Sequence, residues 1–327
     1  MPHSTPSPPW FLQGPHKQTF GGHYLPGKGI GPPERRYFVP LADGDTLVFH
    51  ENLPRNWVPG SPLAVLVHGL TGSHRSGTIC RLGWLAAEKG LGVIRVDLRG
   101  AGDGLALARR PYNGGSSDDL GAMLSQIAKI HPTSPYAVMG VSLGANITLR
   151  LAGTLGSAIH EKHPMWKGLV AMNPPVDLAA CCALLARPSN RVYEKVFLKA
   201  LWEAELARRK IHPLPISLSE QMPKTLTEFD NQVTAPIWGF ASGMDYYIWG
   251  SSVKYLEAIE IPSWILTAKD DPFIDYRSLE PLVGRSTRMQ IDIVPHGGHL
   301  GYIIWKNGPH RWAEPIAIKK LHAMAAS

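Results

Sequence analysis

The chain has 327 residues, of which 33 are glycine and 29 are proline, together about 19 % against about 12 % in average proteins. Such a surplus suggests disorder, but 44 % of the residues are hydrophobic and only 18 % are charged, so the chain has enough apolar surface to fold. The glycines and prolines are therefore predicted to serve turns. The length fits one large α/β domain with an insertion, or two ordinary domains.

The charge balance and the cysteines exclude several classes of protein. The net charge is +7, but the densest basic run, 207–210, ends a predicted helix, where the helix dipole favours cations, so nucleic acid is not an expected partner. Three cysteines, with Cys181 and Cys182 adjacent, cannot form a disulfide framework. The first residues lack the features of a signal peptide, and the longest apolar run, 178–186, is too short to span a membrane. We expect a cytoplasmic protein with no integral membrane segment.

The first 62 residues form a leader that holds 12 of the 29 prolines. We expect an extended arm packed on the core, with strands at 36–40 and 46–51. Beyond it, short apolar runs alternate with helical stretches, which predicts a parallel sheet with right-handed crossovers. The predicted strands are 62–68, 93–97, 136–140, 168–173, 264–268 and 289–294, and the predicted helices are 81–89, 118–130, 143–152 and 311–324. Asp118 and Asp119 are predicted to cap the second of these helices.

This alternation stops between residues 175 and 261. An apolar stripe at helical spacing runs from Tyr193 to Ala204, and a segment rich in aromatic residues follows from Phe229 to Trp249. We therefore predict one catalytic domain overall, in which a helical cap at 176–260 interrupts a core formed by 63–175 and 261–327. The aromatic residues either line an acyl pocket or simply pack within the cap.

A short motif at 140–144 points to nucleophilic catalysis. Gly140, Ser142 and Gly144 match the pattern G-x-S-x-G, with a buried strand before it and a helix after it. This is the context of the nucleophile elbow, in which a strained turn exposes the serine and the glycines relieve crowding between strand and helix. The alternative is a serine in an ordinary strand–helix turn.

A serine nucleophile needs a base and an orienting carboxylate. His299 follows the last predicted strand in a glycine-rich loop and is favoured over its competitor His296. Asp271 follows the preceding strand, and Pro272 favours an extended backbone there, so it is the predicted acid. Asp270 is the second choice, as a turn or helix-capping residue, and Asp177 is the third. The chain order Ser, Asp, His is that of α/β-hydrolases.

The oxyanion hole requires two backbone N–H groups aimed at the developing charge. We assign them to Leu143, next to the nucleophile, and to Leu70, in the loop 68–72 after the first central strand. No H-E-x-x-H, paired C-x-x-C or Walker A pattern occurs, so no metal and no cofactor are predicted. The run 99–104 superficially resembles a dinucleotide-binding motif, but its third glycine is misplaced and no helix opens on it.

With these motifs in place, the sequence resembles the YheT-like branch of the α/β-hydrolases, which includes bacterial YheT proteins and eukaryotic lipases or esterases. The matching strings lie at 14–19, 68–73, 99–102, 140–146, 228–230, 233–236, 246–247, 268–273 and 297–301. The resemblance implies Ser142, Asp271 and His299 as nucleophile, acid and base. The chain departs from the family at Ala145, where glycine is frequent, at Lys17, where leucine is usual, and near Asn113, where a histidine is common.

The sequence thus predicts an α/β-hydrolase fold: a mostly parallel, twisted eight-stranded sheet with helices on both faces and a helical cap insertion. The expected function is a serine esterase that acts on carboxylic esters with an apolar acyl group, of short to medium length or from a lipid. Two alternatives remain. A serine acyltransferase would use the same triad, and a binding protein could retain the fold without catalysis.

Overall fold

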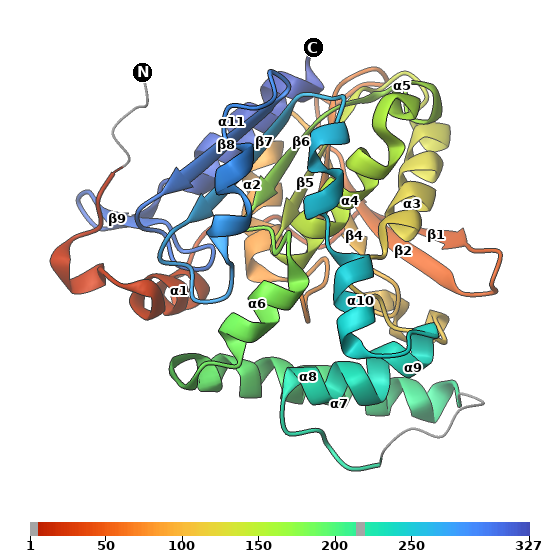
Figure 1. The fold of residues 1–327 in the computed structure, drawn as a ribbon. Coiled ribbons are helices and arrows are strands. Elements are labelled where there is room, and N and C mark those ends of the chain that lie inside the picture. The colour runs from red at the N-terminus through yellow and green to blue at the C-terminus, as the bar shows by residue number, and fades with distance from the viewer. Residues whose placement is uncertain (1–5, 214–219) are drawn as a thin grey trace.

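The computed structural model describes residues 6–213 and 220–327, so parts of the predicted arm and cap (1–5 and 214–219) lie outside the described residues. An eight-stranded sheet in the order β1-β2-β4-β3-β5-β6-β7-β8 forms the centre (Figure 1). Its strands are β1 (Arg35–Pro40), β2 (Thr46–Asn52), β3 (Leu63–Val67), β4 (Gly92–Asp97), β5 (Tyr136–Val141), β6 (Trp166–Met172), β7 (Ser263–Ala268) and β8 (Met289–Val294). Only the pairs β1–β2 and β2–β4 of this sheet are antiparallel, which confirms the predicted mostly parallel sheet.

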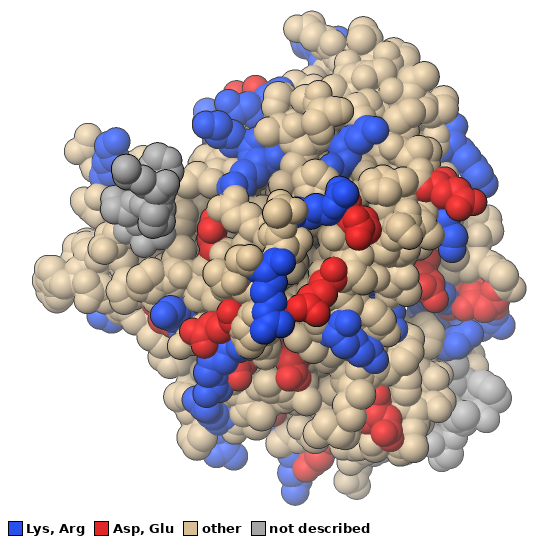
Figure 2. All heavy atoms as spheres, turned by 45° about the horizontal axis from the view of Figure 1, so that its top comes forward, with Lys and Arg blue, Asp and Glu red and all other residues tan. Residues whose placement is uncertain are grey.

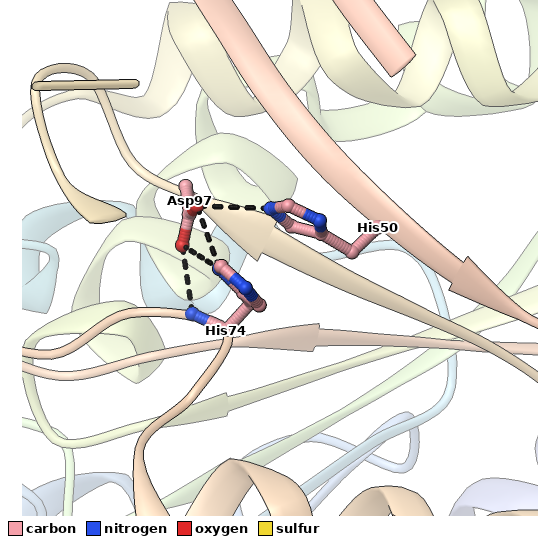
Figure 3. A group of neighbouring side chains, drawn as sticks. All are labelled: His50, His74 and Asp97. Carbon is pink, nitrogen blue, oxygen red and sulfur yellow. Dashed lines mark hydrogen bonds and ion pairs between the residues drawn. The ribbon is translucent and has the colours of Figure 1, made fainter. Parts of the chain in front are cut away.

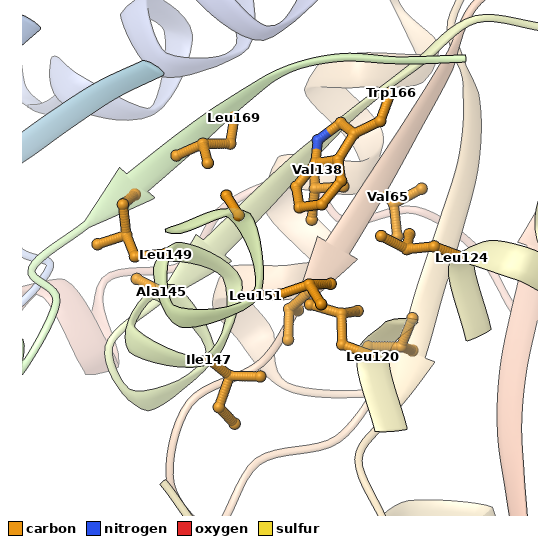
Figure 4. Packing of buried hydrophobic residues seen from close by; sticks show 14 of the residues in the cluster. Val65, Leu120, Leu124, Val138, Ala145, Ile147, Leu149, Leu151, Trp166 and Leu169 are labelled. Carbon is orange, nitrogen blue, oxygen red and sulfur yellow. The ribbon is translucent and has the colours of Figure 1, made fainter. Parts of the chain in front are cut away.

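Helices cover both faces of the sheet, as expected when parallel strands are buried on both sides. They are α2 (Gly77–Ala87), α3 (Ser117–Ile130), α4 (Leu143–Leu155), the short α5 (Ile159–Lys162) and α11 (Ala313–Ala325). Alternate residues of β3 enter different cores: Val65 packs with α3 and α4, whereas Leu66 packs with α2 and α11. Figure 4 shows the first of these cores, with Leu149 of α4 and Leu120 of α3 close to the sheet.

The segment between β6 and β7 contains helices and no strand among its described residues. We call this segment, residues 176–260, the insertion. Its helices are α6 (Leu178–Leu185), α7 (Arg191–Ile211), α8 (Leu226–Phe229), α9 (Ala235–Trp238) and α10 (Gly243–Gly250). They lie beyond one end of the sheet (Figure 1) and form a small apolar cluster of their own around Leu198 and Trp202. The division into arm, core and cap stays a prediction about folding units.

The leader is not simply extended. Residues Pro15–Tyr24 form the helix α1, and a hairpin that the sequence analysis missed, β9 (Ile303–Trp305) with β10 (Pro309–Arg311), lies beside it. Gln18 bonds to Ile303 in both directions: its Nε2 donates to the carbonyl oxygen at 3.1 Å, and its Oε1 accepts from the N–H at 2.8 Å. The expectation of an extended arm was wrong because Gly21–Gly22 suggested a loop. A Cβ on Gly22 would lie 2.6 Å from the Cα of Gly301, so this glycine permits close packing of a helix.

The predicted helix-capping role of Asp118 and Asp119 was also wrong. Both lie in the first turn of α3, where neither caps it, and Ser116 is the N-cap residue. Asp119 instead accepts two hydrogen bonds, at 2.6 and 2.8 Å, from the buried guanidinium of Arg99. This pair ties α3 to the chain that follows β4.

The surface carries both signs of charge. On the face shown in Figure 2, lysine and arginine side chains alternate with aspartate and glutamate rather than forming one basic stripe. The exclusion of nucleic acid as a partner stays a prediction. Within 6–213 and 220–327, no helix has the length and apolar character needed to cross a bilayer.

Candidate active site

Ser142 lies at the sharp turn between β5 and α4. Its φ is +52°, a backbone conformation that residues other than glycine rarely adopt, so the backbone here is strained. Two neighbouring glycines make the turn possible. A Cβ on Gly140 would lie 2.4 Å from the carbonyl oxygen of Gly144, and a Cβ on Gly144 would lie 2.3 Å from the carbonyl oxygen of His68. The strand–turn–helix context predicted for the motif is therefore present.

The structure brings Ser142, His299 and Asp271 into one hydrogen-bonded chain. The Nε2 atom of His299 lies 3.0 Å from Ser142 Oγ, and its Nδ1 atom lies 2.8 Å from Asp271 Oδ2. A carboxylate accepts only, so His299 carries its proton on Nδ1 and its Nε2 accepts from the serine hydroxyl. An imidazole in this tautomer can take the serine proton.

Asp271 is held by several donors at once. Its Oδ1 accepts from the backbone N–H groups of Phe273 and Ile274 at 2.8 and 3.2 Å. Its Oδ2 accepts from Asn173 Nδ2 at 2.6 Å as well as from His299. The side chain of Asp271 is fully buried, so these bonds replace water and fix the carboxylate toward the imidazole.

Asn173 is a site residue that the sequence analysis missed. It follows β6 with a φ of +48°, and its Nδ2 also donates to the carbonyl oxygen of Gly298 at 3.2 Å. Its Oδ1 accepts from the hydroxyl of buried Tyr302 at 2.7 Å. Asn173 thus joins the loop that carries Asp271 to the loop that carries His299. Its place at the end of a buried strand was the only available signal.

The second-choice residues lie elsewhere. Asp270 Oδ1 accepts from the N–H groups of Gly297 and Gly298, both at 2.8 Å, so it orders the loop of His299, in line with the turn role suggested for it. The Nδ1 atom of His296 lies 3.4 Å from Asp270 Oδ2, and His296 is not part of the hydrogen-bonded chain that ends at Ser142. Asp177 caps α6, where its Oδ1 accepts from the N–H of Ala180 at 3.0 Å.

The loop after β3 is fixed by the imidazole of His68. Its Nε2 accepts from the N–H of Leu98 at 3.1 Å, so its Nδ1 carries the proton and donates to the carbonyl oxygen of Gly69 at 2.8 Å. Burial lowers the pKa of His68, which keeps the ring neutral. Because the C=O and N–H of a trans peptide point in opposite directions, holding the Gly69 carbonyl also orients the N–H of Leu70. Leu143 is the first residue of α4, so its N–H has no partner within the helix.

Comparison with known proteins identifies the family of this arrangement. Residues 61–301 match the family described as Serine aminopeptidase, S33. The chain is 32 % identical over 270 residues to YheT of Escherichia coli (strain K12), an esterase by name, covering 80 % of this chain and 77 % of that protein. The chain therefore belongs to the α/β hydrolases, in the family described as Serine aminopeptidase, S33. The predicted superfamily, its YheT-like branch and the predicted class, a serine hydrolase like the carboxylesterases and lipases, are confirmed.

Two further matches agree with this family. Phospholipase ABHD3 of Mus musculus is 26 % identical over 281 residues, with 83 % of this chain and 67 % of that protein covered. The crystal structure of a 2,6-dihydroxy-pseudo-oxynicotine hydrolase has a TM-score of 0.60 at 16 % identity, and covers 90 % of this chain and 68 % of the other. The second match shows a shared fold alone.

In this hydrolase, a cavity of about 310 Å³ opens beside Ser142 and beneath the insertion. Its walls are mostly apolar, with Leu143 from the core and Leu178, Leu201 and Phe229 from the insertion. Some of the aromatic residues from 229 to 249 line this cavity and also pack in the interior. The interpretation of the segment as an acyl pocket stays a prediction. Trp249, in contrast, stacks on the guanidinium of Arg150, 4.4 Å from the ring centre.

A few polar groups of the hydrolase also face this cavity. Asp230 begins a π-helical turn between α8 and α9, a feature often found at functional sites, and burial raises its pKa to about 6. The thiols of Cys181 and Cys182 line the same cavity, but burial raises their pKa and keeps them protonated. Neither thiol is therefore a candidate for the nucleophile.

Three residues of the hydrolase that could hold a metal ion, His50, His74 and Asp97, meet beside the loop after β3 (Figure 3). Asp97 Oδ2 lies 3.0 Å from His50 Nε2 and 2.8 Å from His74 Nδ1, and its Oδ1 accepts from the N–H of His74 at 2.7 Å. Arg75 Nε donates to His74 Nε2 at 3.1 Å, so Nδ1 of that ring carries the proton and is not a free metal ligand. We interpret the cluster as a hydrogen-bonded anchor between that loop and β4.

Proposed function

We propose that the chain hydrolyses carboxylic esters with an apolar acyl group, with Ser142 as nucleophile, His299 as base and Asp271 as orienting acid. One observation carries this proposal: the bonds of 3.0 and 2.8 Å that link the three residues beside an apolar cavity. Ser142 Oγ attacks the ester carbonyl while His299 Nε2 takes its proton and passes it to the leaving alcohol. Water, activated by the same imidazole, then hydrolyses the acyl-enzyme.

The negative charge that develops on the carbonyl oxygen needs hydrogen-bond donors. The N–H groups of Leu70 and Leu143 take this role in the proposal. Both residues line the cavity together with Ser142, and the bonds of His68 fix the first of these peptides. Asn113 also lines this cavity, and its buried Nδ2 has no hydrogen-bond partner within the described residues.

The binding-protein alternative receives less support than catalysis. A binding protein has no need of a strained serine hydrogen-bonded to an imidazole that is itself held by a buried carboxylate. The acyltransferase alternative differs only in the acceptor, an alcohol in place of water.

A fluorophosphonate probe tests the nucleophile directly. Wild type is expected to react covalently, and Ser142→Ala is expected to lose all labelling. Ser125→Ala, at an exposed serine of α3, is the matched control and retains it. Absence of labelling in the wild type, or labelling that persists in Ser142→Ala, refutes the serine mechanism.

A series of p-nitrophenyl esters from acetate to laurate then measures acyl preference. The apolar walls predict that kcat/KM rises with chain length until the cavity is full, because each buried methylene contributes about 0.8 kcal/mol. A profile that falls steadily from acetate contradicts the assignment of this cavity to the acyl chain.

A further inference from the structure

Ser142 lies where two cavities meet. The first is the cavity beneath the insertion described above. The second, of about 400 Å³, lies beneath α1 and the start of α7. Both are lined by Ser142, Phe197 and Phe273, but His299 lines only the second and Leu143 only the first.

This asymmetry separates the two halves of an ester. In the tetrahedral intermediate, the carbon bonded to Ser142 Oγ carries an oxyanion, the acyl chain and the alcohol oxygen. As the bond from carbon to the alcohol oxygen breaks, that oxygen must take the proton that His299 Nε2 received from Ser142, so it lies within hydrogen-bonding reach of this atom. We propose, on the basis of the function proposed above, that the cavity beneath α1 binds the alcohol portion of the ester and the cavity beneath the insertion binds the acyl chain.

The walls of the second cavity indicate which alcohols it accepts. Its outer wall is apolar yet open to solvent: Phe20 and Tyr24 of α1 are 41 % and 73 % exposed, and Val192 and Val196 of α7 are both 61 % exposed. Exposed apolar side chains of this kind around an opening suit an apolar ligand.

Two polar side chains of this cavity already have partners. Arg81 is paired with Glu314, with its Nη2 donating to Oε1 at 2.8 Å. Thr19 Oγ1 donates to the carbonyl oxygen of Pro15 at 2.6 Å and accepts from the N–H of His299 at 2.9 Å. The substrate class is therefore an ester of a bulky apolar alcohol, of long-chain or aromatic type, rather than of methanol or ethanol.

Thr19 also gives α1 a direct connection to the chemistry. Because it holds the backbone N–H of His299, the same helix that forms the alcohol wall also positions the loop of the imidazole. The leader is thus part of the alcohol site, and not only a support for the core.

Helix α7 crosses both cavities and allows a matched test. Val196 lines the cavity beneath α1, whereas Ala200, one helical turn later, lines the cavity beneath the insertion. Val196→Trp and Ala200→Trp place the same indole in the two cavities in turn. Val58→Trp, at a valine that is 60 % exposed and lines neither cavity, is the control.

Two substrate series are measured for each variant: butyrate esters of ethanol, benzyl alcohol and octanol, and p-nitrophenyl esters of increasing acyl length. Val196→Trp is expected to lower kcat/KM for the octyl ester relative to the ethyl ester by about tenfold. Its deacylation rate constant and acyl-length profile stay unchanged, because the alcohol has left before deacylation. Ala200→Trp is expected to shorten the preferred acyl chain and to leave the alcohol ratios unchanged.

The acceptor reaction tests the same site in reverse. With benzyl alcohol added, partition of the acyl-enzyme toward the benzyl ester falls in Val196→Trp and not in Val58→Trp. The assignment is overturned if Val196→Trp changes the acyl-length profile while Ala200→Trp changes the alcohol ratios. It is also overturned if the alcohol ratios are unchanged in both Val196→Trp and Val192→Trp. Fluorophosphonate labelling is measured in parallel. Failure of the proposed function appears as an unlabelled wild type, whereas a wrong cavity assignment appears as full labelling with the wrong profile.

Discussion

The sheet core and the insertion hold buried carboxylates in different ways. At the end of β4, burial alone would raise the pKa of Asp97, but hydrogen bonds from His50 and His74 lower it well below its ordinary value. In the insertion, Asp230 accepts at 2.6 Å from the hydroxyls of Thr234 and Tyr247, and burial raises its pKa to about 6. The core therefore stabilises the negative charge of Asp97, whereas the insertion stabilises the negative charge of Asp230 poorly.

The same contrast separates the catalytic edge from the cavity walls. Asp271 receives hydrogen bonds from Asn173, His299 and two backbone N–H groups, so its orientation is set before substrate arrives. The insertion contributes mostly apolar surface, which selects by size and shape. Changes at the catalytic edge should abolish activity, and changes in the insertion should mainly alter selectivity or stability.

The largest contrast is expected between two glycines. Gly144→Ala forces a Cβ to within 2.3 Å of the His68 carbonyl oxygen, so strand and helix must separate, at a cost of about 3 kcal/mol or more. Fluorophosphonate labelling of Ser142 should be lost and thermal unfolding should occur at a lower temperature. Gly239→Ala in the insertion meets nothing within 4 Å and strains only its φ of +76°, which costs about 1 kcal/mol. Equal losses in the two variants would contradict the contrast.

Two adjacent carboxylates provide the next contrast. Asp271→Asn keeps the shape of the site but cannot stabilise the imidazolium or hold the productive tautomer, so kcat should fall by roughly 10³- to 10⁴-fold. Asp270→Asn retains an oxygen that can accept from Gly297 and Gly298, and should lower kcat by less than about tenfold. Steady-state kinetics on one p-nitrophenyl ester decides the matter. A larger loss in Asp270→Asn would reassign the acid.

Two buried tyrosines test whether the hydrogen bonds at the catalytic edge matter. Tyr302→Phe leaves Asn173 Oδ1 without its 2.7 Å donor, which should lower the free energy of unfolding by about 1 kcal/mol and reduce kcat. The hydroxyl of Tyr136, at the other end of the sheet, has no partner within the described residues, so Tyr136→Phe should not destabilise the protein. Urea titrations and kinetics on both variants provide the measurement. If kcat is unchanged in Tyr302→Phe but falls in Tyr136→Phe, Asn173 does not need the hydrogen bond from Tyr302.

Particular residues show how far the sequence could predict this site. Ser142, Asp271 and His299 follow β5, β7 and β8, which are parallel strands of one sheet, and the carboxyl ends of such strands meet at one edge. Asn173 was missed because an asparagine after a strand forms no recognisable pattern. Thr19 lies in the matching string at 14–19, but a threonine in a proline-rich leader suggested no role at the site. Helix α1 was missed for a related reason: its residues have no apolar period, since its contacts depend on Gln18 and on close approach at Gly22. The fold class and the eight strands of the main sheet were predicted because buried parallel strands form short, continuous apolar runs between helical stretches.

The smallest expected effect concerns the pH dependence of stability. Asp230 has a pKa near 6 when folded and an ordinary value near 3.8 when unfolded. Between pH 4 and 6 the folded state therefore binds more protons than the unfolded state, so this group lowers the free energy of unfolding as pH rises. Urea titrations at several pH values should show wild type losing stability relative to Asp230→Asn across this window, with a constant difference above it. The opposite slope would mean that the cavity stabilises the carboxylate as firmly as the core stabilises Asp97, and the contrast between the two regions would fail.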